Sequence, residues 1–377
     1  MITTIGIIIG IIGIVVGFPP FIEFVKLHKK KKNKFKQRFS KLSFSEKIVL
    51  YIWYFPVENQ NQSSWAVKES QVILGNLENA KKNPGLGIAI LSIEFALTYF
   101  KEQANSRILN CINWGIIRTQ KKEPYFILYE KRDESITKIE YVPDFRHTIA
   151  FGIILSKTRR KLSHIDEYLK YLVNNQHNDG GWTAGKGHTI SELFSCIYAI
   201  ELIVLNRTNK KVKSNYDNVI KKAVIWLVNN ISNDYLWKSN VFDEYWDMIF
   251  SSTWVLNRLI PLNLEELYEN WSDIVNKISL NLLDNHQKID WNTKDKFQKF
   301  RLETRIAAAL YKGQAFNYYN SEINEQVESF IREWKERTII FMQEISFDDL
   351  DLATSLFLAE PLLGYEIIND IVEKKLK

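Results

Sequence analysis

Apolar residues in this chain fall into runs with helical spacing, and short polar turns separate the runs. From residue 44 onwards the runs come in pairs: an amphipathic run ends in a polar turn, and a more apolar run follows. Apolar positions that recur every three or four residues predict helices, and an almost continuously apolar run predicts a helix buried on most sides. The expected helices cover residues 44–55, 86–100, 108–119, 145–155, 190–205, 219–230, 245–260, 274–283, 300–312, 327–343 and 349–363. Two further helical runs are expected, one that continues to about residue 80 and one that ends at residues 174–176.

Each polar turn between paired runs holds an aromatic residue, and these residues recur at a nearly constant interval. They are Trp65, Phe126, Trp182, Trp237, Trp291 and Phe347, separated by 54 to 61 residues. Constant spacing over six units indicates repeats, in which each helix pair buries its apolar face against its neighbours. Six pairs that close on themselves predict an all-α ring with the more apolar helices inside. Residues 129–141 alternate charged and β-favouring residues and predict a small hairpin.

The most regular unit carries a family resemblance. Residues 175–182 read NQHNDGGW and residues 188–200 read HTISELFSCIYAI, which resembles the repeat of the prenyltransferase and squalene-cyclase superfamily. Weaker versions of this turn surround Phe126 and Trp237. The resemblance covers about residues 44–370. It implies an α6–α6 toroid of six helix pairs, the fold shared by protein prenyltransferases and class II terpene cyclases, within a domain of residues 44–377.

Residues 2–22 form an uncharged apolar stretch that ends near Pro19 and Pro20. At 1.5 Å per residue a helix of this length reaches roughly 30 Å, about the thickness of the hydrocarbon core of a bilayer. The stretch therefore predicts a transmembrane helix within residues 1–25 that contacts the lipid bilayer. A cleaved signal peptide is the alternative, but its basic residues normally precede the apolar run, whereas here they follow it.

Residues 26–43 form a basic linker. Nine Lys and Arg residues stand between Lys26 and Lys41 without an acidic residue, although the net charge of the whole chain is only +6. The rest of the chain is therefore slightly acidic and is not expected to bind nucleic acid. Positive charge on one side of the span predicts a single-pass protein of the cell membrane, with the N-terminus outside and the toroid domain cytoplasmic. The same residues are expected to attract anionic lipid headgroups.

Four glycines, Gly6, Gly10, Gly13 and Gly17, share one face of the predicted span. Small residues at this spacing let two helices approach closely in lipid, which predicts self-association, although glycine is also common in spans by chance. Cys111 and Cys196 lie far apart within apolar runs. Two separated cysteines cannot build a disulfide framework, so both are expected to be buried free thiols.

Charged residues gather where the inner helices are expected to begin. In a toroid these helix starts share one mouth of the cavity, where the helix dipoles favour anions. His147 also follows Asp144 closely enough to pair with it as a base. The residues expected to bind a ligand at this mouth are Asp144, Arg146, His147, His188, Glu192, Asp247, Arg301 and Glu303, and Asp243 and Glu244 lie in the same region.

The chemistry of the family transfers only in part. Protein prenyltransferases hold zinc through an Asp and a Cys two residues apart, together with a His, but Phe194 stands two residues before Cys196. No zinc site and no other cofactor is therefore expected. Class II cyclases protonate an alkene with an Asp in an Asp-x-Asp-Asp run, and Asp348, Asp349 and Asp351 give the reversed order. These three are candidate general acids, and an acidic helix cap is the alternative interpretation.

Three functions remain open from the sequence. The first is a membrane-anchored toroid that binds a ligand or partner in or at the mouth of its cavity without the zinc chemistry of the family. The second is a membrane-bound enzyme acting on isoprenoid lipids, similar to a terpene cyclase or prenyltransferase, with Asp348, Asp349 or Asp351 as the acid. The third is a carbohydrate-active protein with paired carboxylates such as Asp144 and Glu192.

Overall fold

The computed structural model describes residues 41–54, 86–101, 105–122, 125–131, 140–185, 189–207, 213–239, 244–288, 296–345 and 350–375. The chain divides into two compact units, Met1–Leu50 and Tyr51–Lys377. The predicted membrane span, its glycines and most of the basic linker lie outside the described residues. In the described ranges, no helix combines the length and apolar character needed to cross a membrane.

The described part of the first unit contains the start of α2 (Phe44–Tyr54). Ser43 and Glu46 form a capping box there: Ser43 N donates to Glu46 Oε2 at 2.9 Å, and Glu46 N donates to Ser43 Oγ at 3.4 Å. This reciprocal pair satisfies two backbone donors that a helix start leaves without partners. It explains why the helix begins where the sequence predicts.

The second unit is predominantly helical, as predicted. One set of its helices comprises α5 (Leu86–Phe95), which continues as the π-helix η2 (Ala96–Phe100), α7 (Phe145–Thr158), α9 (Leu193–Asn206), α11 (Glu244–Leu259), α13 (Lys296–Ala315) and α15 (Leu352–Leu363). The helices that alternate with them are α6 (Asn105–Arg118), α8 (Leu162–Asn174), α10 (Lys213–Asn229), α12 (Trp271–Lys288), α14 (Ser321–Glu344) and α16 (Tyr365–Lys375), with short 3-10 helices η4 (Ile260–Leu262) and η5 (Leu264–Glu266).

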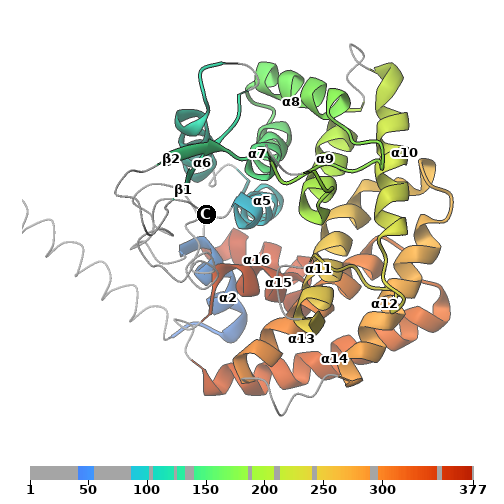
Figure 1. Ribbon diagram of the computed structural model, residues 1–377. Coiled ribbons are helices and arrows are strands. Elements are labelled where there is room, and N and C mark those ends of the chain that lie inside the picture. The colour runs from blue at the N-terminus through green and yellow to red at the C-terminus, as the bar shows by residue number, and fades with distance from the viewer. Residues whose placement is uncertain are drawn as a thin grey trace, which may run out of the picture. The chain divides into compact units, whose positions relative to one another are not determined.

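These first six helices, which we call the central helices, contact one another in a closed order. Along the chain α5 contacts α7, α7 contacts α9, α9 contacts α11, α11 contacts α13, α13 contacts α15, and α15 returns to α5 (Figure 1). Their burial matches this position. Every residue of α9 from 193 to 203 is buried, and so is every residue of α15 from 352 to 359. A helix buried on all sides needs apolar residues all round, which is how these runs read in the sequence.

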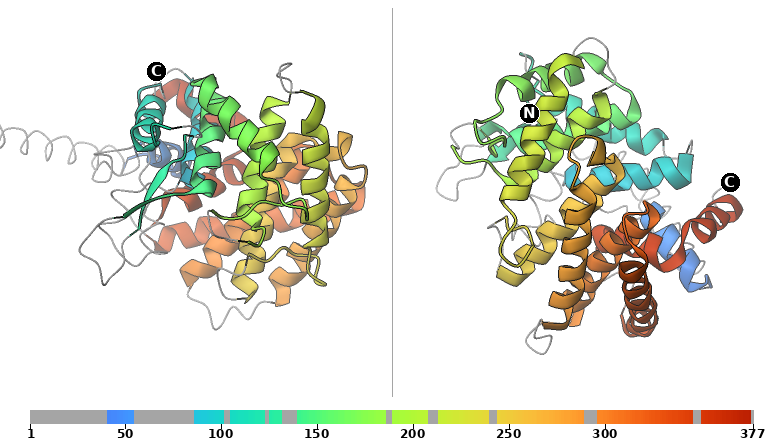
Figure 2. Two further views of the ribbon diagram at one scale, coloured as in Figure 1. Left: turned by 45° about the horizontal axis from the view of Figure 1, so that its top comes forward. Right: turned by 90° about the vertical axis from the view of Figure 1, so that its right-hand side faces the viewer.

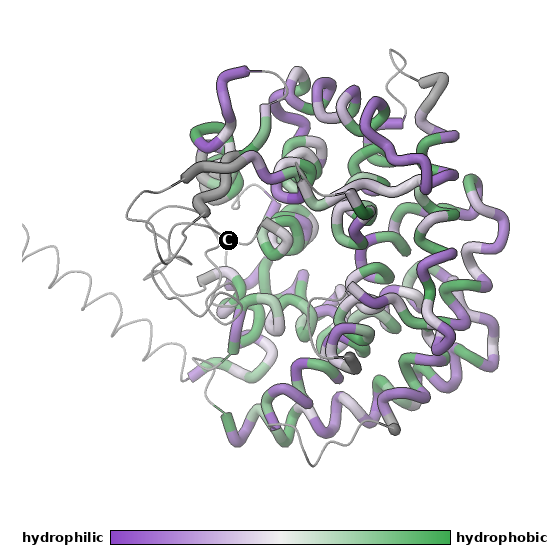
Figure 3. The backbone as a smooth tube through the Cα atoms, viewed as in Figure 1, coloured by the Kyte–Doolittle hydropathy of each residue, from purple (hydrophilic) through white to green (hydrophobic). Residues whose placement is uncertain are grey.

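The alternating helices cover the central ones. α8 contacts α7 and α9, α10 contacts α9, α12 contacts α11 and α13, α14 contacts α13, and α16 contacts α15. Figure 1 shows α8, α10, α12 and α14 on the outer side of the central helices. α14 buries Ile323, Val327, Phe330 and Trp334 on one face, and Figure 3 shows hydrophilic positions alternating with hydrophobic ones along it. This one-sided burial is typical of an amphipathic helix.

The expected hairpin forms between α6 and α7. β1 (Leu128–Lys131) and β2 (Glu140–Pro143) pair antiparallel, with Leu128 opposite Pro143 and Lys131 opposite Glu140. The pair lies at the edge of the unit beside α6 and α7 (Figure 2). Asp144 N, directly after β2, donates to Ile127 O at 3.0 Å, and this bond fixes the position at which α7 begins.

The repeated turn has the same geometry in two units. Trp182 Nε1 donates to Leu172 O at 2.9 Å, and Trp237 Nε1 donates to Leu227 O at 2.9 Å. Both indoles therefore close the turn onto the end of the preceding outer helix, ten residues earlier. Phe126 lies in the corresponding turn between α6 and α7, and its counterparts Trp65, Trp291 and Phe347 lie outside the described residues. The turns at Trp182 and Trp237 therefore share one geometry.

Candidate functional site

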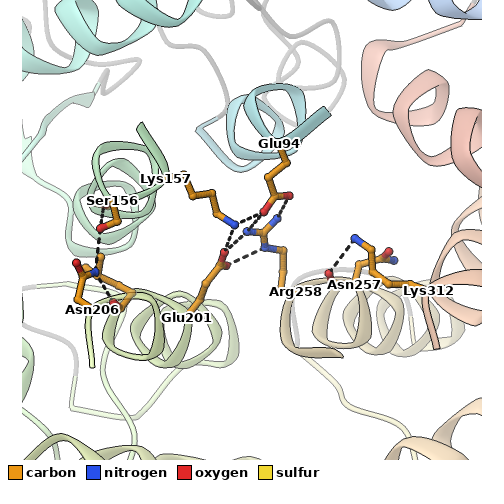
Figure 4. Close-up of polar contacts among 10 residues, drawn as sticks. Glu94, Ser156, Lys157, Glu201, Asn206, Asn257, Arg258 and Lys312 are labelled. Carbon is orange, nitrogen blue, oxygen red and sulfur yellow. Dashed lines mark hydrogen bonds and ion pairs between the residues drawn. The ribbon is translucent and has the colours of Figure 1, made fainter. Parts of the chain in front are cut away.

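The interior of the second unit holds a charged residue from each of the six central helices, and every one lies in the second half of its helix. We call this set the central charge cluster: Glu94 of α5, Lys157 of α7, Glu201 of α9, Arg258 of α11, Lys312 of α13 and Glu360 of α15. Figure 4 shows the first five of these residues. Ionisable side chains are rarely buried in an apolar interior unless they are paired. The cluster is therefore a built feature of the fold.

Arg258 is the centre of the cluster. Its Nε donates to Glu201 Oε2 at 2.9 Å, and a second bond joins Nη2 to Glu201 Oε1. Toward Glu94, Nη1 donates to Oε2 at 2.6 Å and Nη2 donates to Oε1 at 3.0 Å. The side chains of Arg258 and Glu201 are each only 1% exposed. One planar guanidinium thus binds two carboxylates in a paired geometry, which joins α5, α9 and α11.

The other cations extend the network. Lys157 Nζ lies 3.1 Å from Glu201 Oε1 and also bonds Glu94, so two cations share two carboxylates. Lys312 Nζ donates to the carbonyl of Asn257 at 3.4 Å, which ties α13 to α11. On the last central helix, Tyr99 Oη donates to Glu360 Oε1 at 3.3 Å.

The electrostatic environment separates the two half-buried acids. Burial alone would raise the pKa of Glu94, but Arg258, Lys157 and Lys312 together hold it well below its usual value. Burial raises the pKa of Glu360 above its usual value, although Lys312 and Tyr99 oppose the shift. Glu94 is thus a stable carboxylate at neutral pH, whereas the charged form of Glu360 is disfavoured.

Aromatic side chains fill the space between the central helices. The Trp254 and Phe357 rings, from α11 and α15, lie 6.3 Å apart between centroids. A carbon added to Gly87 of α5 would lie 2.8 Å from Tyr198 Oη and 3.3 Å from the Trp254 ring. In the closed order of contacts, two central helices separate α11 from α5 on each side, so these two helices are opposite one another. Trp254 of α11 therefore reaches across the centre to α5. Glycine at position 87 is needed because the opposite side chains approach its backbone.

A buried arginine lies among these aromatic rings. The guanidinium carbon of Arg305, on α13, lies 4.4 Å from the centroid of Phe250 and 4.7 Å from that of Phe357. Arg305 is 3% exposed. A guanidinium over aromatic faces is attracted by the ring quadrupoles, and the attraction is strongest where water is excluded. The protein therefore places its own cation on the π faces of the interior.

The acidic residues predicted at the mouth act as helix caps. Asp144 accepts from His147 N at 2.8 Å at the start of α7. Glu192 accepts from the backbone of Phe194 and Ser195 at the start of α9. Asp351 accepts from Thr354 N at 2.7 Å and from Thr354 Oγ1 at 2.9 Å at the start of α15. These carboxylates satisfy backbone donors that the helix starts leave without partners.

The predicted basic residues pair with these caps. His147 Nδ1 lies 2.9 Å from Asp144 Oδ1. Burial alone would raise the pKa of Asp144, but the charge and hydrogen bonds of His147 lower it to about 2. Arg146 Nη1 lies 4.0 Å from Glu192 Oε1, and its side chain is 38% exposed. These residues thus form local ion pairs, and Arg146 is the more exposed of the two cations.

Two more predicted residues lie in pairs elsewhere. Arg301 Nε lies 3.1 Å from Asp351 Oδ2. Asp247 is fully buried and accepts from Ser239 N at 2.7 Å, which holds the loop before α11 in place.

Glu303 lies among outer helices. It bonds His286 Nε2 of α12 at 2.8 Å and lies 3.7 Å from Arg337 Nε of α14. The remaining predicted residues, His188, Asp348 and Asp349, lie outside the described ranges. The described members of the predicted set therefore form separate pairs and do not converge on one reacting atom.

Possible metal ligands and the two cysteines were located in the part of the chain that the structure describes. No group of three or more His, Cys, Asp and Glu side chains there is placed to hold a metal ion. Cys111 and Cys196 are free and buried, as predicted. Burial raises the pKa of the Cys196 thiol well above its usual value, and its Sγ accepts from Trp182 N at 3.2 Å. Cys196 thus supports the repeated turn.

Two grooves open beside outer helices. One, of about 480 Å³, lies between α13 and α14 and is lined in part by Tyr311 and Ile339. The other, of about 560 Å³, lies between α12 and the turn that follows α10, and its lining includes Tyr235, Tyr268 and Lys277. Neither groove is lined by the central charge cluster or by the residues predicted at the mouth.

No model of a known protein family matches this chain, and no curated protein matches it. The geometry of the chain itself therefore carries the functional conclusion.

Proposed function

We propose that residues 51–377 form an α6–α6 toroid that binds a ligand or partner. In this proposal it does not catalyse the reactions of the prenyltransferase and squalene-cyclase superfamily that its sequence resembles. The closed order of contacts among α5, α7, α9, α11, α13 and α15 supports the toroid. The identical bonding of Trp182 and Trp237 supports a repeat origin. In this proposal residues 2–22 hold the protein in the cell membrane, with the toroid on the cytoplasmic side, as the charge pattern predicts.

The position of Arg305 carries the argument against a terpene cyclase. A carbocation in such an enzyme would be stabilised by the faces of aromatic rings. Here the guanidinium of Arg305 covers Phe250 and Phe357 at 4.4 and 4.7 Å. A substrate cation placed on the same rings would meet a fixed like charge in a medium of low dielectric constant, where repulsion is strong. The interior is therefore suited to holding the fold together.

In this proposal the ligand binds at the predicted mouth, where Arg146 is exposed. The carboxylates of Asp144, Glu192 and Asp351 accept hydrogen bonds from backbone N–H groups at the helix starts. Arg146 remains 38% exposed beside Glu192. A guanidinium at this distance from a carboxylate, 4.0 Å, retains donors for an anionic or carbonyl group of a ligand. Arg146, with His147 beside it, is the recognition group that we propose for this mouth.

The runner-up is an isoprenoid enzyme, and one observation favours it. The rings of Phe194, Phe250, Trp254 and Phe357 form a continuous aromatic set in the interior, as expected for a site that handles isoprenoid chains. Its acid would be Asp348, Asp349 or Asp351. Asp351 is already bonded by Thr354 and lies 3.1 Å from Arg301. These are the partners of a charged carboxylate, whereas alkene protonation needs the protonated form.

The test separates turnover from binding in the full chain, purified in detergent. Isotope-labelled squalene, farnesyl diphosphate and geranylgeranyl diphosphate are incubated with the protein, and products are sought by mass spectrometry. Native mass spectrometry of the same preparations measures any ligand that is retained from the cell. The variants are Asp351→Asn, which keeps a good cap, Arg146→Gln, and Arg160→Gln as the control, an exposed arginine beyond the opposite end of α7.

We expect no product from the wild-type protein, and a retained ligand that is lost in Arg146→Gln but kept in Asp351→Asn and Arg160→Gln. Product formation that disappears in Asp351→Asn would overturn the proposal and establish the enzyme. Equal retention in all three variants would remove Arg146 from the binding site.

A further inference from the structure

The turn after α10 repeats the turn after α8 with an offset of 55 residues. His177 N donates to Gly181 O and Ser232 N donates to Leu236 O, both at 2.9 Å. Gly180 N donates to His177 O and Tyr235 N donates to Ser232 O, again both at 2.9 Å. With the matched indole bonds, the two turns are copies of one design. Differences between them are therefore informative position by position.

The first turn is closed directly against the next outer helix. Gln176 Nε2 donates to Gly180 O and to Val219 O of α10, both at 2.8 Å. Gly180 has a φ of +97°, and a carbon added to it would lie 2.4 Å from Lys222 O. The Gln176 amide and the missing side chain of Gly180 therefore let this turn contact α10 directly.

The second turn replaces both of these residues. The counterpart of Gln176 is Ile231, which has no amide, and the counterpart of Gly180 is Tyr235. Because Tyr235 carries a Cβ, the turn cannot approach Lys277, the counterpart of Lys222, as closely as the first turn approaches α10. The result is the groove of about 560 Å³ between this turn and α12.

Tyrosine in place of glycine at position 235 destabilises the backbone, which argues that the tyrosine is kept for a function. Tyr235 has a φ of +51°, a left-handed conformation that costs a residue with a side chain about 1–2 kcal/mol relative to glycine. The chain keeps this conformation and holds the ring 47% exposed at the edge of the groove. Lys277 Nζ lies 5.7 Å from the ring centroid. Strained backbone under an exposed aromatic side chain is typical of a recognition position.

The lining defines the ligand. Ile231 and Ile274 provide a half-buried apolar floor, Tyr235 and Tyr268 provide rings, and Asp273 and Lys277 provide exposed charges at the rim. The carbonyls of Tyr235 and Ile274 are the counterparts of the two that the Gln176 amide bridges in the first turn. A primary amide offers two N–H donors, one for each carbonyl of such a pair.

We propose that this groove binds an extended peptide segment through a glutamine side chain, whose amide bridges the carbonyls of Tyr235 and Ile274. Aliphatic neighbours of that glutamine pack on Ile231 and Ile274, and the peptide backbone lies between Asp273 and Lys277. A partner chain thereby supplies the group that the first turn carries internally as Gln176. The site is separate from the mouth at Arg146 and does not depend on whether the interior binds a ligand.

The test uses two photoreactive probes on the full-length protein in detergent. The first is acetyl-photoleucine-glutamine-photoleucine-amide, and the second replaces glutamine by methionine, which has a similar shape and no amide. Cross-linking is measured against probe concentration, and the labelled residues are located by peptide mass spectrometry. We expect labelling on residues 228–235 and 268–277, with half-saturation about tenfold lower for the glutamine probe, as two added neutral hydrogen bonds give.

A closing variant gives an independent check. Ile231→Gln/Tyr235→Gly rebuilds the first turn in the second position, so we expect it to lose labelling while its thermal stability is kept or raised. Ile231→Val/Tyr235→Phe is the matched control, which retains the groove and the labelling. Equal half-saturation for the two probes, labelling elsewhere, or labelling that survives closure in a folded protein would each overturn the proposal. So would displacement by maltoheptaose without a preference for glutamine, which would assign the groove to carbohydrate.

Discussion

Replacing Arg258 by methionine tests whether the central charge cluster holds the central helices together. The guanidinium binds Glu201 from Nε at 2.9 Å and Glu94 from Nη1 at 2.6 Å and Nη2 at 3.0 Å. Methionine fills a similar volume but neutralises neither carboxylate. The variant therefore buries Glu201, whose side chain is 1% exposed, with Lys157 at 3.1 Å as a cationic neighbour.

The magnitude follows from burial. Removing one partner of a buried ion pair costs about 3–5 kcal/mol, because the remaining charge stays in a medium of low dielectric constant. In a unit of this size 1 kcal/mol lowers the melting temperature by about 2 °C, so we expect a drop of about 6–10 °C. The control is Arg207→Met. Arg207 binds Glu266 at 2.7 Å, but the Glu266 side chain is 60% exposed, and such pairs contribute about 0–1 kcal/mol.

The stability loss of Arg258→Met is also expected to depend on pH. In the wild-type protein burial acts against Glu94, but Arg258 and the lysines hold its pKa well below the usual value. Its stabilising contribution is therefore complete above the unfolded pKa, about 4.3, and is lost as the pH falls through the folded pKa. Without Arg258 the burial effect is less opposed, so the charged form is penalised and the deficit of the variant grows from pH 4.5 to pH 8.

Melting curves followed by circular dichroism at pH 4.5, 6 and 8 measure both effects. A loss no larger than that of Arg207→Met would refute the structural role of the cluster. A deficit that is independent of pH would show that the loss comes from packing and not from the carboxylates.

Three further predictions concern stability, measured as free energies of unfolding in urea. Burial raises the pKa of Glu360, so the protein loses stability as the pH rises from the unfolded pKa of this carboxyl through its folded pKa. Glu360→Gln should therefore stabilise the protein at pH 8 and leave its stability unchanged at pH 4. Gly180→Ala should cost about 1–3 kcal/mol, since its Cβ would meet Lys222 O at 2.4 Å, whereas Gly185→Ala, with open space around it, should cost under about 1 kcal/mol. Trp237→Phe should cost about 1–3 kcal/mol, because it removes the bond to Leu227 O in a buried turn, and an unchanged value would contradict the role of the indole.

The helices and the repeat could be predicted from the sequence because burial leaves a local pattern. The run expected over residues 300–312 became α13 (Lys296–Ala315), and the run over 86–100 became α5 with η2. α16 was not foreseen, although Ile368, Ile371 and Val372 give it a buried face. Its apolar positions follow Gly364, where φ is +75°, and a turn of that kind ends a helix without indicating that another begins.

The central charge cluster could not be assembled from the sequence because its pairs are remote. Glu94 and Arg258 are 164 residues apart, and only the closed order of the central helices brings them together. A signal was present in each run, since Glu94 and Glu201 stand as single charges among apolar residues. An ionisable residue in such a run requires a partner, but the sequence does not identify which one.

The binding role of the predicted mouth residues stays a prediction, but neighbouring positions of one helix point in different directions. Glu303 and Arg305 are two residues apart on α13, yet Glu303 meets His286 of α12 while Arg305 meets Phe250 and Phe357. Two positions on a helix differ by about 200° in direction. A list of residues near a helix start therefore mixes side chains that point inward with side chains that point to the outer helices.

The contact between α15 and α5 has a consequence for how the protein is made. Ribosomal synthesis delivers α5 more than 250 residues before α15 (Leu86–Phe95 against Leu352–Leu363), so the apolar surface that α15 will cover stays exposed while most of the chain emerges. An open array of repeats can fold progressively from its first unit, but here the final neighbour of α5, the first central helix, arrives nearly last. Long-range closure of this kind slows folding and lengthens exposure to aggregation. Nascent chains of this protein should therefore depend on chaperones until the last helix pair has left the ribosome.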